Sequence, residues 1–175
     1  IDPDMMPHVK LINSAVEAGD ESRAALLDEV VKYAGNDLLL YRAESPRELV
    51  EKQEQVWDDV LVRLARHFSV SFQPTVGILH KAQSPEMLRK LRSAIDPLHH
   101  VPATAMVSVT GLTGSGLLAV ALRERLVDAD VAWTAAHVDE DYQISLWGED
   151  YEAAARRRQR RREFDAAVNV INLLG

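Results

Sequence analysis

The chain has 175 residues, of which 47% are hydrophobic, so it is long enough to bury one substantial core. The absence of cysteine excludes disulfides, thiolate zinc sites and cysteine nucleophiles. A formal net charge of -7 argues against a general binder of nucleic acid or anionic membranes, because both need a positive field.

Apolar residues recur at helical spacing along most of the chain, and convincing strand alternation is hard to find. We therefore predict an all-α, bundle-like domain that spans residues 1–175 as a single unit. A first helix is expected from Pro7 to near Gly19 and a second from about Asp20 to Gly35. The second helix should bury Leu26, Leu27, Val30, Val31 and Ala34. Residues 38–43 are short, apolar and ambiguous.

Two serine–proline pairs predict helix starts. Ser45 is expected as the N-cap of one helix with Pro46 as its first residue, and Ser84 with Pro85 repeats the pattern. The first of these helices has a core stripe in which Trp57 is a central anchor. The stripe consists of Leu49, Gln53, Val56, Trp57, Val60, Leu61, Leu64 and Phe68.

Residues 101–122 contain no charged side chain, a length that could cross a bilayer. Pro102, several hydroxyl residues and three glycines dilute their hydrophobicity, so we reject stable membrane insertion and predict one buried central helix. The chain should then turn at residues 128–130. A last helix is expected after Gly148, with core positions at Phe164, Ala167, Val168, Ile171 and Leu174.

Motifs for small-ligand chemistry are weak. The glycines of residues 111–116 lack the lysine and serine or threonine of a phosphate-binding loop, so close helix packing explains them better. His99, His100 and His137 do not have the spacing of a metal site, and no Gly-x-Ser-x-Gly motif marks a nucleophile. We expect no metal, no cofactor and no enzymatic activity.

Residues 132–150 combine acidic side chains with large aromatic ones. Aromatics supply contact area and charges supply selectivity, a combination typical of recognition surfaces. An ordinary structural interpretation competes with this one: Trp133 and Trp147 would be core residues, and the acids would simply face water. The sequence pattern alone favours the structural interpretation.

Six arginines between Arg156 and Arg162 indicate a possible nucleic-acid adapter. Acidic neighbours such as Glu152 and Asp165 can absorb much of this charge through ion pairs along the helix. We therefore prefer a solvated or partner-facing helix, and keep nucleic-acid binding as the alternative function.

The order of several short segments resembles a known family, the assembly chaperones that handle the α subunit of F-type ATP synthase in mitochondria and α-proteobacteria. The matching segments are Ile1-Asp2-Pro3 with Met6-Pro7, residues 36–43, Gln55-Val56-Trp57-Asp58, Pro74-Thr75-Val76-Gly77-Ile78, Ala132-Trp133, Asp139-Glu140 with Gln143, residues 147–150, and residues 161–164. Together they run almost the length of the chain.

The resemblance implies a non-enzymatic protein that holds the new α subunit, shields its β-facing surface and hands it over. It also implies a helical C-terminal domain without the family's β-rich N-terminal region. The arginine-rich, cysteine-free composition and the intact spacing favour the bacterial cytoplasm, with the mitochondrial matrix as the alternative. An acidic position that matters in the family falls on Asp139 or Glu140, with Asp139 preferred. The expected partner-binding residues are Asp139, Glu140, Asp141, Tyr142, Trp147 and Glu149.

Overall fold

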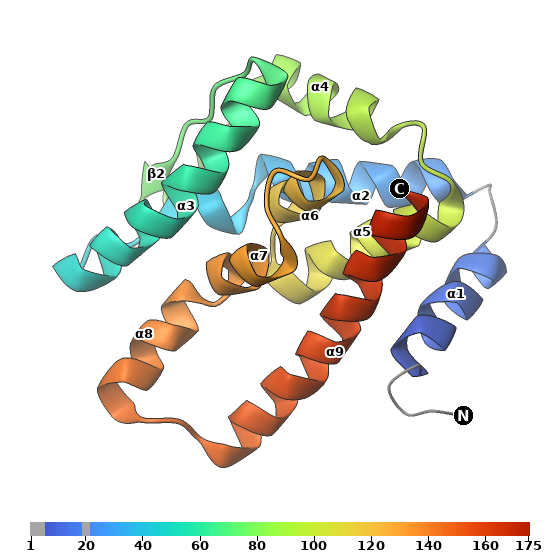
Figure 1. Ribbon diagram of the computed structural model, residues 1–175. Helices are drawn as coiled ribbons and strands as arrows, with labels where there is room; N and C mark the ends of the chain where they lie inside the picture. The colour runs from blue at the N-terminus through green and yellow to red at the C-terminus, as the bar shows by residue number, and fades with distance from the viewer. Residues whose placement is uncertain (1–5, 19–21) are drawn as a thin grey trace.

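The structure, a computed structural model, describes residues 6–18 and 22–175. Helices dominate these residues (Figure 1), which confirms the predicted all-α class. The helices are α1 (Met6–Ala18), α2 (Arg23–Gly35), η3 (Leu38–Leu40, a 3-10 turn), α3 (Arg47–Phe68), α4 (Pro85–Ile95), α5 (His100–Thr113), α6 (Gly116–Arg123), α7 (Ala129–Ala136), α8 (Val138–Trp147) and α9 (Tyr151–Leu174). Two strands of two residues each, β1 (Tyr41–Arg42) and β2 (Thr75–Val76), pair in parallel.

The ambiguous segment 38–43 therefore divides into η3 and β1. The short, buried helix α6 lies at the centre, with α2, α5 and α9 packed around it. Helix α3 packs against α8, while α8 and the first half of α9 extend away from the core (Figure 1). Within the described ranges, no helix is long and apolar enough to cross a membrane.

The prediction of one central helix over residues 101–122 is wrong. Helix α5 ends at Thr113, Gly114 adopts a left-handed conformation with φ of 75°, and α6 begins at Gly116. Ser115 between them caps α6, because its hydroxyl accepts a hydrogen bond from the Leu118 amide at 3.0 Å. An uncharged run has no polar face that would mark the break, so hydrophobicity alone did not reveal it.

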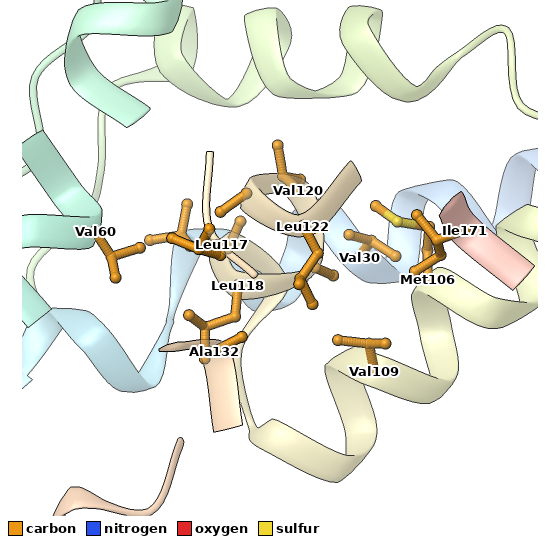
Figure 2. Close-up of a cluster of buried hydrophobic side chains, with 14 of the residues drawn as sticks. Val30, Val60, Met106, Val109, Leu117, Leu118, Val120, Leu122, Ala132 and Ile171 are labelled. Carbon is orange, nitrogen blue, oxygen red and sulfur yellow. The ribbon is translucent and has the colours of Figure 1, made fainter. Parts of the chain in front are cut away.

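Side chains from α6 converge with those of the surrounding helices (Figure 2). Leu117, Leu118, Val120 and Leu122 lie among residues of α2, α3, α5, α7 and α9, and the pictured neighbours are almost completely buried. These neighbours are Val30, Val60, Met106, Val109, Ala132 and Ile171. The core thus forms around α6 from helices that are spread along the chain from α2 to α9.

The carboxylate of Asp37 is fully buried beside the break between α5 and α6. It accepts hydrogen bonds from the Ser115 hydroxyl at 2.6 Å, the Leu117 amide at 2.9 Å and the Leu39 amide at 3.1 Å. One side chain thereby caps both η3 and α6. Burial raises the pKa of Asp37 to about 7, although these hydrogen bonds lower it.

Gly116 permits the close approach of α2 and α6. A Cβ atom at this position would lie 2.2 Å from the Val30 carbonyl oxygen and 2.8 Å from the Ala34 amide nitrogen. The predicted role of these glycines in close packing therefore holds for Gly116. It does not hold for Gly111 and Gly114, where a Cβ would meet nothing within 4 Å.

The predicted helix starts have mixed outcomes. Ser84 caps α4 by accepting from the Met87 amide at 3.4 Å, with Pro85 as the first helical residue, as expected. The start at Ser45 is wrong by one residue: Pro46 has an extended backbone with ψ of 166°, so it occupies the N-cap position and makes no side-chain cap.

Later boundaries also differ from the prediction. Asp128 is the N-cap of α7, so the expected turn at residues 128–130 is already the start of a helix. Leu174 is 56% exposed rather than a core residue, and Leu26 and Val31 are half-buried. The predicted boundary at Gly19 and Asp20, like the matching segment at residues 1–3, lies outside the described residues.

We predict that Gly116→Ala destabilises the protein by about 1 to 3 kcal/mol, because the added methyl group meets rigid backbone atoms of α2. Gly111→Ala is the matched control: it lies in an exposed position of α5 with open space around it, so stability should stay the same or rise by about 1 kcal/mol. Urea unfolding of both variants measures the difference. Equal loss in both variants would contradict close packing at Gly116.

We also predict a pH effect from Asp37. Its folded pKa of about 7 lies above the ordinary 3.8, so the folded protein retains a proton that the unfolded chain releases. The Asp37 contribution to stability is therefore present below about pH 4 and is lost as the pH rises to about 7.

The comparison of wild type with Asp37→Asn isolates this contribution from that of other carboxyl groups. Between pH 4.5 and 7.5, the free energy of unfolding of the wild type should fall relative to that of the variant. A constant difference between the two proteins across this range would show that Asp37 is not protonated in the fold.

Candidate partner-binding surface

Helix α8 and the start of α9 contain the residues that the sequence predicted as a recognition surface. Gly148, with φ of 82°, ends α8, and the Asp150 side chain caps α9 by accepting from the Ala153 amide at 3.1 Å. Only residues 148–150 connect the two helices, so the chain reverses direction at a point far from α6 (Figure 1).

Three large apolar side chains are exposed at this reversal. Trp147 and Tyr151 are each 83% exposed and Leu146 is 54% exposed. We call these three residues the apolar tip. The structural interpretation of the two tryptophans is thus right for Trp133, which is buried, and wrong for Trp147. Neighbouring exposed apolar side chains of this size are typical of interaction sites.

A small pocket of about 190 Å³ lies between α8 and α9 beside the apolar tip. Its walls combine aliphatic and aromatic surface with charged groups at the rim. The lining residues are Glu140, Gln143, Ile144, Trp147, Gly148, Glu149, Asp150, Ala153, Ala154 and Arg157. The pocket therefore brings together three of the predicted partner-binding residues, Glu140, Trp147 and Glu149.

Ion pairs with α9 hold Glu140 and Asp141. Arg157 lies 2.6 Å from an Asp141 oxygen and 3.7 Å from a Glu140 oxygen, and Arg160 is also 3.7 Å from Glu140. Both carboxylates remain partly exposed. Their first role is therefore to join α8 to α9. A contact with a partner would be made by carboxylates that already form these ion pairs.

The six arginines between Arg156 and Arg162 divide into two sets. One set faces other helices and consists of Arg157, Arg160 and Arg161; the other set is exposed and consists of Arg156, Arg158 and Arg162. Arg161 pairs with Asp130 of α7 at 2.6 Å and Asp165 at 2.9 Å, and its guanidinium lies 5.5 Å from the centre of the Trp133 ring. The sequence predicted ion pairs along the helix, but most of the observed pairs cross to α7 and α8. Half of the arginines in residues 156–162 therefore form ion pairs within the protein, and Arg162 bonds to Gln159, which weakens the nucleic-acid alternative.

His137 lies between α7 and α8 and is buried. Its Nδ1–H donates to the Trp133 carbonyl at 2.7 Å, and its Nε2 lies 3.5 Å from Arg160. Burial lowers the pKa of His137, so the ring is neutral and packs 4.0 Å from the Trp133 ring. Among residues 6–18 and 22–175, no group of three or more His, Cys, Asp or Glu side chains could hold a metal ion.

Asp139 has a structural partner that the sequence did not indicate. Its carboxylate accepts a hydrogen bond at 2.7 Å from the side-chain amide of Gln53, which is buried on α3. The Gln53 oxygen in turn accepts from the Ala43 amide at 2.8 Å. A glutamine within the apolar stripe was the available signal, because a buried amide needs partners.

Tyr142 is also buried, so it offers a partner little surface and acts mainly in packing. The Trp57 indole N–H donates to the Ala135 carbonyl at 2.7 Å, which adds a second link between α3 and the α7–α8 segment. Asp139, Tyr142 and Trp57 thus position α8. Asp139 is itself exposed despite its bond to Gln53, as are Trp147 and Glu149, which make no such contact in the described part of the chain.

We predict that Asp139→Lys lowers the free energy of unfolding by about 1 to 3 kcal/mol, because the buried Gln53 amide loses its acceptor. The sequence pattern predicts instead an intact fold for this charge reversal. Glu149→Lys is the matched control: Glu149 is exposed like Asp139 but has no hydrogen bond or ion pair within the described residues, so its effect should not exceed about 0.5 kcal/mol. Denaturant unfolding of the two variants distinguishes the predictions, and equal midpoints would exclude a structural role for Asp139.

Comparison with known proteins identifies the relatives of this chain. A family model described as "ATP12 chaperone protein" matches residues 1–65. Atu1473 of Agrobacterium tumefaciens, described as a candidate chaperone, is 32% identical with a TM-score of 0.93, and the match covers all of this chain and 66% of that one.

Atp12 from Paracoccus denitrificans is 31% identical with a TM-score of 0.91, and the match covers all of this chain and 75% of that one. An aspartate-to-lysine variant of the Paracoccus protein matches equally well. The chain thus spans about two thirds to three quarters of these relatives. In agreement with its sequence resemblance, the chain belongs to the ATP12 chaperone family.

Proposed function

We propose that this protein is a non-enzymatic chaperone in the assembly of F-type ATP synthase that binds the free α subunit and hands it over to the growing catalytic head. The observation that carries this proposal is the exposure of Trp147 beside the pocket of α8 and α9. Membership of the ATP12 chaperone family supports the general role.

The chemistry of the apolar tip suits the task. A subunit interface has an apolar centre with aromatic anchors and a polar rim. A chaperone that covers such an interface must offer a similar surface, yet it must also release the client. A tip of three exposed apolar side chains with charges around it provides a small anchor, which favours reversible binding.

We assign different roles to the predicted partner-binding residues. Trp147 and Glu149 would contact the client directly, and Glu140 would line the edge of the contact. Asp139 and Asp141 would act by positioning α8 against α3 and α9.

We further propose that residues 1–175 work as one helical domain in the bacterial cytoplasm. The described helices share one hydrophobic core, which supports a single unit. The relatives from Agrobacterium tumefaciens and Paracoccus denitrificans are bacterial proteins, which supports a bacterial location over the mitochondrial matrix.

Trp147→Ala should weaken binding of isolated α subunit by about 2 to 4 kcal/mol, or roughly 30- to 1000-fold, because an exposed aromatic anchor loses its contact area. Titration calorimetry with the two purified proteins measures the change. Leu173→Ala is the matched control: Leu173 is 81% exposed at the other end of α9 and should leave the affinity unchanged.

Failure of the wild-type protein to bind α subunit would sink the proposal. If Trp147→Ala and Leu173→Ala had equal effects, the α subunit would still be the client, but the apolar tip would be excluded as its contact. Filter binding of single-stranded nucleic acid at low salt tests the alternative function, and retention that falls steeply with added salt would favour it.

A further inference from the structure

The pocket beside the apolar tip has a rim of uncompensated negative charge. This rim consists of Glu149 and Asp150, which line the pocket and are exposed, and of Glu152, which is exposed in the adjoining first turn of α9. Among the described residues, no basic side chain lies within ion-pair distance of these three carboxylates. Arg156 follows Glu152 by one helical turn without forming an ion pair with it, so the rim keeps its charge.

The basic residue that lines the pocket already forms ion pairs within the protein. Arg157 lines the pocket, but its guanidinium is 2.6 Å from Asp141 and 3.7 Å from Glu140, so the two α8 carboxylates neutralise it. The rim acids have no such partner among the described residues, so they are available to a cation on the client.

The interior of the pocket is apolar. Ile144 and Trp147 of α8 face Ala153 and Ala154 of α9 across a volume of about 190 Å³. This space is too small for a helix or a strand and suits one large apolar side chain. The small alanines on the α9 side leave the room that such a side chain would fill.

We propose that this pocket recognises a short segment of the client in which an apolar side chain lies next to a lysine or arginine. The apolar side chain enters between Ile144 and the two alanines, and the cation pairs with Glu149 or Glu152 at the rim. This assignment rests on the proposed function, since it specifies what the same surface binds. The rim also repels acidic segments, which adds selectivity that apolar contact alone lacks.

Association kinetics with isolated α subunit test the proposal. The double variant Glu149→Gln/Glu152→Gln should associate about 5- to 10-fold more slowly at low ionic strength and should lose most of the salt dependence of the association rate, since rim charges act mainly on encounter. The matched control is Glu29→Gln/Glu86→Gln, which removes the same charge from α2 and α4 and should retain wild-type kinetics.

Trp147→Ala should behave differently from the charge variant. It removes the wall of the pocket, so the complex should dissociate faster while the salt dependence of association stays as in the wild type. If Trp147→Ala weakens binding but Glu149→Gln/Glu152→Gln keeps wild-type kinetics, the basic segment is excluded and the proposed function stands. If the wild type does not bind α subunit at all, both proposals fall.

A tiled array of peptides from the α subunit sequence gives an independent readout. The wild-type protein should select peptides with an apolar residue beside a lysine or arginine, and replacement of that basic residue by glutamate should abolish the signal. Selection of acidic peptides, or an unchanged signal after the replacement, would overturn the proposal.

Discussion

The buried carboxylate of Asp37 fixes the centre of this molecule. It joins η3 to the first turn of α6 through the Ser115 hydroxyl and two backbone amides, at the point where the chain leaves α5. Desolvation of a carboxylate is costly, and three hydrogen bonds offset only part of this cost, so the pKa of Asp37 stays raised at about 7. The benefit is geometric: α6 enters the core at a fixed angle, and Gly116 lets α2 approach it without a clash. The surrounding helices pack on this junction.

A second set of polar contacts positions the surface helices. Gln53 and Trp57 of α3 bind Asp139 and the Ala135 carbonyl, which sets the position of α8. Arg157 and Arg160 of α9 then pair with the carboxylates of Asp141 and Glu140 on α8, which joins the two helices. The acids that the sequence marked as a recognition element therefore act largely as supports, which hold Trp147 where a partner can meet it.

Sequence patterns predicted the helical fold well wherever a helix has two different faces. The stripe around Trp57 and the start signal at Ser84 correspond to buried and capping positions because each is a local pattern. The break at Gly114 was missed, since an uncharged segment has no periodic contrast. The sequence also located the candidate surface but not its division of roles. Exposure of Trp147 and the bond from Gln53 to Asp139 depend on residues far apart in the chain, which local periodicity does not describe.

An exposed tryptophan on a free protein carries a risk of self-association, because two apolar tips could bury each other. The charge around Trp147 opposes this outcome. Two copies that approached tip to tip would bring their rims of Glu149, Asp150 and Glu152 together, and the net charge of -7 adds to the repulsion. A client with a basic side chain beside its apolar residue meets attraction instead. The same acids can thus keep the surface available and select what occupies it, which explains why strong negative charge and bare aromatic area coincide at the end of α8.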